Sequence, residues 1–204
     1  MSRFGPDPQA FFEAVYRKPA PWDIGGPQPA MVKLLVEHPP EAPVLDVGCG
    51  TGDLAIHIAE SGVKALGVDF VQEAIDKARA KARLLPPEIA NLVDFRVTDV
   101  FDAESLNQSF GGIIDSGLLH LLDPDQSDAF IERLASLLRP GGRLYLHEFA
   151  VTFPIPNVPR AVVEEEIIER FAPARGWRIL TLRTEQFLSR FAPVAATVAC
   201  VERV

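Results

Sequence analysis

A short apolar run followed at once by three alternate glycines, in VLDVGCGTG from Val44 to Gly52, constrains the fold of this chain more than any other feature. The run 44–47 contains one acid, Asp46, and otherwise predicts a buried strand. Glycine tolerates positive φ and lets a ligand approach the main chain without a Cβ in the way. A strand that ends in such a turn predicts an α/β fold with a ligand site beyond the carboxyl end of the strand.

The rest of the chain alternates between strand and helix patterns. Short strands spaced by helices predict right-handed crossovers and a mostly parallel, doubly wound sheet with helices on both faces. Two late strands follow one another without a full helix between them, so they predict an antiparallel hairpin at one sheet edge. The expected strands are 44–47, 65–68, 92–97, 110–115, 143–150, 177–185 and 195–204, and the expected helices are 7–17, 28–38, 52–60, 71–85 and 126–138.

Length, charge and cysteine content limit the kind of protein. The 204 residues predict a single domain, with N-terminal helices and a lid loop in 1–40, a ligand-binding core in 41–150 and a substrate-side segment with the terminal hairpin in 151–204. The net charge is −8 and the basic residues are scattered, which argues against nucleic acid as a partner. Two cysteines without metal-ligand spacing predict neither a disulfide framework nor a metal site. The first twenty residues do not resemble a signal peptide and no apolar run could span a membrane, so we expect a cytoplasmic protein without a membrane partner.

The glycine spacing separates two kinds of nucleotide site. Dinucleotide folds favour GxGxxG with the pyrophosphate at the helix N-terminus, whereas this chain has GxGxG followed by Asp53. A carboxylate at that position would repel a pyrophosphate, which favours a cationic or zwitterionic ligand. Asp69 ends the second strand, where a carboxylate can accept both hydroxyls of a ribose. Asp99 follows the third strand and can accept a hydrogen bond from an exocyclic amine such as that of adenine.

The ordered set VLDVGCGTG, GVD, TDVF and LLRPGG resembles the motifs of the class I S-adenosylmethionine-dependent methyltransferases over about residues 44–150. The resemblance implies S-adenosyl-L-methionine as cofactor, S-adenosyl-L-homocysteine as product, and a Rossmann-like seven-stranded sheet whose last strand is antiparallel. The core residues that the motifs assign to the cofactor are Asp46, Gly48, Gly50, Gly52, Asp69, Phe70, Asp99 and Val100.

Two further segments resemble a narrower branch, the thiopurine and thiol/halide methyltransferases. PWDIGGPQP resembles the tryptophan-bearing N-terminal segment of that branch, which implies a cofactor contact for Trp22 and, by a looser alignment, acceptor contacts for Phe12 and Tyr16. IIDSGLLHLL resembles its fourth-strand end, which implies that Asp115 and Ser116 contact the methionyl part of the cofactor. The segment after residue 150 departs from the branch, so neither a halide nor a thiopurine acceptor carries over.

Candidate acceptor-binding residues follow the fourth and fifth strands. His120 is the leading candidate for a general base, because imidazole has an ordinary pKa near neutrality; the alternative is a partly exposed histidine without a role. A thiol or an acidic hydroxyl that arrives ionised would need no base. His147 or Glu148 could line the acceptor pocket or be satisfied within the strand, and Phe149 and Phe153 could form an apolar floor or belong to the core.

These patterns predict a methyltransferase that acts on a thiol, hydroxyl or nitrogen of a small aromatic or heteroaromatic molecule. Two alternatives stay open at this point, a non-catalytic S-adenosylmethionine-binding module and an NAD-dependent oxidoreductase. The first is open because methyl transfer requires no particular catalytic residue. The sequence does not decide between a monomer and a homodimer.

Overall fold

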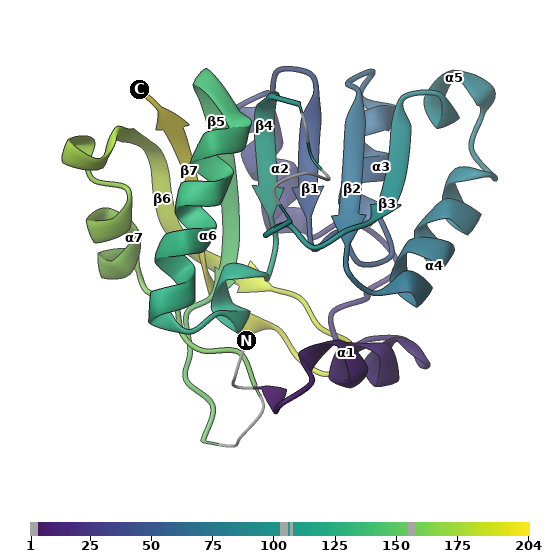
Figure 1. The fold of residues 1–204 in the computed structure, drawn as a ribbon, viewed down its shortest axis with the longest axis horizontal. Helices are drawn as coiled ribbons and strands as arrows, with labels where there is room; N and C mark the ends of the chain where they lie inside the picture. The colour runs from purple at the N-terminus through teal and green to yellow at the C-terminus, as the bar shows by residue number, and fades with distance from the viewer. Residues whose placement is uncertain (1–3, 103–105, 107, 155–157) are drawn as a thin grey trace.

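A seven-stranded sheet in the order β3-β2-β1-β4-β5-β7-β6 organises the chain (Figure 1). The structure is a computed structural model that describes residues 4–102, 106, 108–154 and 158–204. Strand β7 pairs antiparallel with both β5 and β6, and the other strand pairs are parallel. The strands are β1 (Val44–Val47), β2 (Ala65–Asp69), β3 (Val93–Val97), β4 (Phe110–Asp115), β5 (Leu138–Phe149), β6 (Trp177–Phe187) and β7 (Val194–Arg203).

Helices cover both faces of the sheet and one of its ends. The helical elements are α1 (Pro8–Tyr16), α2 (Pro29–Glu37), α3 (Asp53–Glu60), α4 (Gln72–Ala82), α5 (Pro87–Ala90), α6 (Pro124–Leu137), α7 (Glu164–Arg170) and the 3-10 turns η2 (Leu119–Leu121) and η3 (Pro173–Arg175). Residues of α6 and α7 share one apolar core with the sheet, and residues of α2, α3 and α4 share another. Figure 1 shows α1 below the sheet, next to the end of α4. None of the helices in the described residues is long and apolar enough to cross a membrane.

The doubly wound sheet with an antiparallel last strand confirms the fold that the sequence predicts. The strands expected at 44–47 and 110–115 have the observed bounds. The expected hairpin is present, but β7 is inserted between β5 and β6, so that β6 is the edge strand.

Several expected boundaries are wrong for local reasons. Helix α6 begins at Pro124 rather than 126, because proline suits the first helical position and the Gln126 side chain accepts a hydrogen bond from the Asp123 amide. Strand β5 begins at Leu138, where the backbone is already extended, rather than at 143. The expected strict alternation also fails, because the described residues between β3 and β4 contain no helix.

Candidate active site

A cavity of about 600 Å³ lies at the carboxyl ends of the parallel strands, where the doubly wound fold places its ligands. Its volume falls in the range of small-molecule sites. The turn after β1, the end of β2, the segment around η2, the N-terminal region and the loop between β6 and β7 all contribute to its lining. No lysine or arginine is among the described residues that line it.

The glycine turn after β1 forms one wall of the cavity. Gly48, Gly50 and Gly52 all have positive φ, which explains the alternate spacing. Gly48 and Gly50 line the cavity, and a Cβ on Gly50 would lie 2.9 Å from the hydroxyl of Tyr16. Gly52 does not line it: a Cβ there would lie 2.6 Å from the ring of Phe95, so this glycine allows α3 to pack closely on the sheet.

Asp53, the acid that favoured a cationic ligand, is neutralised within the protein. The ammonium of Lys81 on α4 lies 2.7 Å from an Asp53 carboxylate oxygen and 2.8 Å from the hydroxyl of Thr51. The preference for a cation therefore comes from other acids of the cavity.

Asp46 and Asp69 are the buried acids that line this end of the cavity. Asp69 accepts hydrogen bonds from the amides of Gly50 at 3.0 Å and Val71 at 2.9 Å, and Asp46 accepts one from the amide of Ala55 at 3.2 Å. Burial raises the pKa of Asp69 to about 6 and that of Asp46 to about 8. A bound cation would lower both pKa values, so this end of the cavity suits a positively charged ligand.

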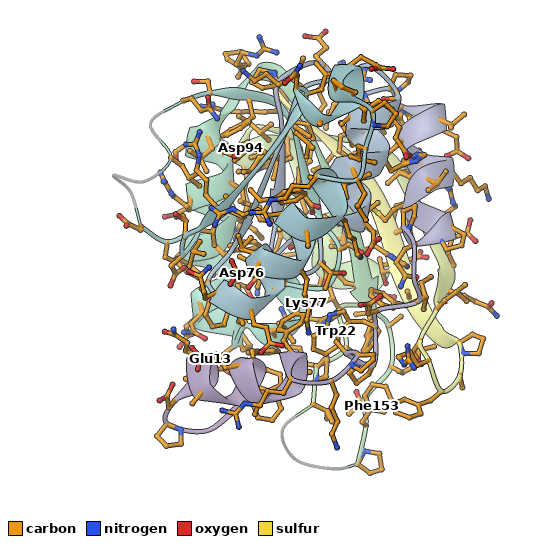
Figure 2. The ribbon with its side chains drawn as sticks, turned by 90° about the vertical axis from the view of Figure 1, so that its right-hand side faces the viewer. Glu13, Trp22, Asp76, Lys77, Asp94 and Phe153 are labelled. Atoms are coloured by element: carbon orange, nitrogen blue, oxygen red, sulfur yellow. The ribbon has the colours of Figure 1, made fainter. Side chains whose placement is uncertain are left out.

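Aromatic side chains from the N-terminal region cover the glycine turn. The Trp22 indole donates a hydrogen bond to the Tyr16 hydroxyl at 3.4 Å, and the Phe12 ring lies 5.9 Å from that of Phe70. All four residues line the cavity, and their contacts with a cofactor or an acceptor stay predictions. Lys77, labelled in Figure 2 above α1, donates a hydrogen bond to the carbonyl of Tyr16 and fastens α1 to α4.

His120, in η2, lines the cavity. It is only 4% exposed, and its ring stacks on Phe149 with 4.6 Å between the ring centroids. Its Nδ1 accepts a hydrogen bond from the Phe149 amide at 3.1 Å, and its own amide donates to Oε2 of Glu148 at 3.0 Å. Burial lowers the pKa of His120 to about 3, so the ring is neutral at physiological pH.

An apolar compartment continues from His120 away from the glycine turn. Phe149 contacts Phe187 edge to face at 4.9 Å and Phe153 at 5.8 Å. Phe191, 84% exposed, lines the cavity from the loop between β6 and β7, and Val194 lines it from the start of β7. Figure 2 places Phe153 and Trp22 at the same end of the molecule, where the cavity lies.

The segment after β5 is fastened over this compartment by Arg160. We call residues 158–163 the strap; two of them, Val158 and Pro159, line the cavity. The Arg160 guanidinium binds both carboxylate oxygens of Glu166, at 2.6 and 2.8 Å, and donates to the carbonyl of Leu122 at 2.8 Å. The Arg160 amide donates to the carbonyl of His120 at 2.9 Å, so the strap and η2 hold each other in place.

Several residues assigned from the sequence do not line the cavity. Asp99 is exposed and accepts a hydrogen bond from the Phe101 amide, while Val100 is buried in the core. Asp115 accepts hydrogen bonds from the amides that open η2, at 2.7 and 3.1 Å, and so positions the turn that carries His120. His147 is fully buried and stacks on Phe187. Ser116, in contrast, lines the cavity.

The sequence analysis missed the contribution of the loop between β6 and β7. The side chain of Gln28 both accepts a hydrogen bond from the Leu188 amide and donates to its carbonyl, at 2.9 Å each, which brings this loop to the cavity. The one available signal was the apolar Phe191 and Val194 in a short segment between two strands, where polar residues are usual.

Comparisons with known proteins agree with this geometry. Residues 44–142 match the methyltransferase domain family. The chain is 33% identical over 172 residues to the 2-heptyl-1-hydroxyquinolin-4(1H)-one methyltransferase of Mycobacteroides abscessus, an alignment that covers 79% of this chain and 74% of the relative.

Two solved structures resemble the whole chain. One, from work on the conversion of a disulfide bond into a thioacetal group during echinomycin biosynthesis, has a TM-score of 0.80 and 28% identity, and the match covers 96% of this chain and 92% of that one. The other is the Burkholderia thailandensis 1,6-didemethyltoxoflavin-N1-methyltransferase with bound 1,6-didemethyltoxoflavin and S-adenosylhomocysteine. It has a TM-score of 0.69 and 22% identity, with 96% of this chain and 84% of that chain covered.

Proposed function

This chain belongs to the class I S-adenosylmethionine-dependent methyltransferases that act on small molecules, and we propose that its acceptor is a hydrophobic aromatic or heteroaromatic compound methylated on sulfur, oxygen or nitrogen. The observation that carries the proposal is the asymmetry of the cavity. One end has buried acids under a glycine turn, and the other is almost wholly apolar around a single histidine.

The acidic end fits the cofactor. S-Adenosylmethionine carries a sulfonium and an ammonium against one carboxylate, so its net charge suits a compartment with Asp46 and Asp69 and without a lysine or arginine among the described lining residues. Gly50 lines the cavity, and its lack of a side chain lets the Tyr16 hydroxyl approach the glycine turn, since a Cβ there would lie 2.9 Å from that hydroxyl. We propose that Asp69 accepts from the ribose and that Trp22 packs against the cofactor, where cation–π attraction adds to the contact.

The aromatic end fits the acceptor. Its walls are Phe149, Phe153, Phe187 and the strap, and His120 supplies a polar atom between the two ends. The Mycobacteroides relative is named for a hydroxyquinolinone with an alkyl chain, which supports a planar, lipophilic acceptor for this chain as well. No lining lysine or arginine is described that could compensate an additional carboxylate on the acceptor.

The cofactor supplies an activated methyl group, and the protein's part is to bind, align and exclude water. The N-terminal aromatic residues and the strap both line the cavity, and we propose that they exclude water from the acceptor and the methyl group. The chemistry then depends on alignment and on the charge of the acceptor atom rather than on a covalent intermediate.

A screen for S-adenosylhomocysteine release tests the proposal. Thiols, phenols, hydroxyquinolones and quinols of similar size are offered with S-adenosylmethionine, and a carboxylated analogue of each active compound serves as the matched control. We expect turnover of lipophilic planar acceptors and much slower turnover of the carboxylated analogues. Cofactor binding without product from any acceptor would favour a non-catalytic binding module.

The residue assignments are proposals of the same kind. Four predicted cofactor contacts lie outside the described cavity lining and stay predictions: Gly52, Asp99, Val100 and Asp115. A cytoplasmic location stays a prediction from the sequence.

A further inference from the structure

We propose that His120 is a hydrogen-bond donor that holds an already ionised acceptor atom through Nε2–H, and that it does not serve as the general base. The inference rests on the proposed function and deepens it, because it restricts the acceptor to groups that lose their proton unaided: thiols, acidic phenols and N-hydroxy heteroaromatics. It replaces the general-base role expected from the sequence.

The first argument is the hydrogen bond at Nδ1. The Phe149 amide donates to this atom at 3.1 Å, which requires a lone pair on Nδ1 and therefore places the proton of the neutral ring on Nε2. A proton on Nδ1 would instead leave a buried backbone N–H facing another donor, an arrangement that proteins avoid. The stack between His120 and Phe149 fixes the ring in this orientation.

Glu148 is compatible with the same tautomer. Its Oε2 lies 3.0 Å from Nδ1 of His120 and accepts the hydrogen bond of the His120 amide. Burial raises the pKa of Glu148 to about 8, so at neutral pH this carboxyl is uncharged and does not draw a proton onto Nδ1. The single lone pair of Nδ1 stays with the Phe149 amide.

The second argument is the position of Nε2. This atom makes no hydrogen bond within the described part of the chain, whereas His120 lines the cavity. A Cβ on Gly117 would lie 3.3 Å from Nε2, so the glycine keeps the space beside this atom free of a side chain. A polar hydrogen on an otherwise buried ring therefore faces the compartment assigned to the acceptor.

The charged groups around the His120 ring are consistent with a neutral hydrogen-bond donor. Asp115 and Glu148 approach from β4 and β5, Arg160 from the strap and His147 from the opposite face of β5. Despite the two acids, burial dominates and lowers the pKa of His120 to about 3, so the ring would hold an abstracted proton poorly. As a neutral donor, the same ring stabilises an anion at no ionisation cost.

The transfer step balances on this basis. The acceptor loses its proton to solvent before it is bound as an anion at Nε2–H. Its lone pair forms the new bond to the methyl carbon, and the bond between sulfur and carbon breaks with its electrons left on sulfur. The negative charge of the acceptor and the positive charge of the sulfonium disappear together, and His120 keeps its proton throughout.

Nitrogen-15 NMR of the histidine rings of the full chain tests the tautomer without any turnover. The chain has four histidines, and the His120→Gln variant assigns the signal by its loss. We expect one pyridine-like nitrogen at Nδ1 and one protonated nitrogen at Nε2, unchanged from about pH 5 to about pH 7, below the pKa of the neighbouring Glu148. A proton on Nδ1, or a titration of this ring in that interval, would overturn the proposal.

Kinetics with para-substituted phenols of graded acidity add a second readout. For every phenol that is methylated, the pH at which kcat/KM levels off should follow the pKa of that phenol. We expect His120→Phe to lower kcat/KM about 10- to 100-fold, because this variant keeps an aromatic ring for the stack but loses the N–H donor. His120→Gln should lower kcat/KM less, because it retains an N–H near the Nε2 position. An inflection at one pH for all phenols, abolished in both variants, would establish a base instead.

The two failures are distinguishable. A binding protein that methylates nothing would contradict the proposed function while the NMR spectrum still reports the tautomer. An active enzyme with a fixed inflection, or with Nδ1 protonated, would contradict only the role assigned here to His120.

Discussion

Replacing Arg160 with alanine should loosen the acceptor compartment while leaving the cofactor end intact. The Arg160 side chain is 11% exposed and makes five hydrogen bonds, to Glu166 twice and to Leu122, Ala161 and Ser127. Its side chain links the strap to α7 on one side and to the η2 region on the other.

The magnitude follows from the buried ion pair. Hydrogen bonds to charged groups contribute about 1.5–3 kcal/mol each but are not additive, and breaking a buried pair costs about 3–5 kcal/mol. Because Glu166 is 19% exposed and keeps Arg170 as a partner at 2.7 Å, we expect a loss at the lower end, about 3 kcal/mol. For a domain of this length that corresponds to a fall in Tm of about 6–12 °C.

The assay combines thermal unfolding, the Kd for S-adenosylhomocysteine and the KM for whichever acceptor the screen identifies. Arg160→Ala should raise the acceptor KM and leave the cofactor Kd nearly unchanged. Arg170→Ala is the matched control, because Arg170 also binds Glu166 but otherwise contacts Asp128 and Pro124, away from the cavity lining. Equal acceptor KM values in the two variants, or a cofactor Kd that rises as much as the KM, would refute the role of the strap.

Three more predictions concern the cofactor end. Asp69→Asn should weaken S-adenosylhomocysteine binding about 10- to 100-fold by calorimetry, because a charged acceptor of hydrogen bonds is lost; an unchanged Kd would exclude the ribose contact. S-Adenosylhomocysteine should change the tryptophan fluorescence of the wild type but not of Trp22→Phe, since Trp177 is buried in the core; a change that persists in the variant would contradict the contact. The ligand-free protein should have a lower Tm at about pH 8 than at about pH 6.5. The pKa values of Asp46 and Glu148 are raised to about 8 on folding, so the folded state binds more protons than the unfolded state and stability falls as pH rises through this interval. The lowered pKa values of His120 and His147 act in the opposite direction only below this interval. A Tm that is constant or rises over this interval would argue against these buried acids.

Local patterns were enough to predict the sheet and the glycine wall of the site. The run 44–47 and the alternate glycines after it depend on burial and backbone conformation, both of which are local properties of the sequence. The same holds for the strand that ends at Asp115.

What the sequence did not reveal depends on contacts between distant segments. Lys81 neutralises Asp53 from another helix, Gln28 binds the loop before β7, and the protonation of His120 depends on Phe149 and Glu148. Spacing within the chain carries no signal for such pairs, so the histidine was predicted as a residue of the site but its chemistry was not.

The central claim is that the acidic and aromatic ends of one cavity bring a methyl donor and a lipophilic acceptor together. Mass spectrometry of the acceptor after incubation with S-adenosylmethionine carrying a deuterated methyl group tests it most directly. The account predicts one labelled methyl group on a sulfur, oxygen or nitrogen atom of a planar hydrophobic compound, formed in step with S-adenosylhomocysteine. Tight binding of S-adenosylhomocysteine with no labelled product from any thiol, phenol, hydroxyquinolone or quinol would contradict it.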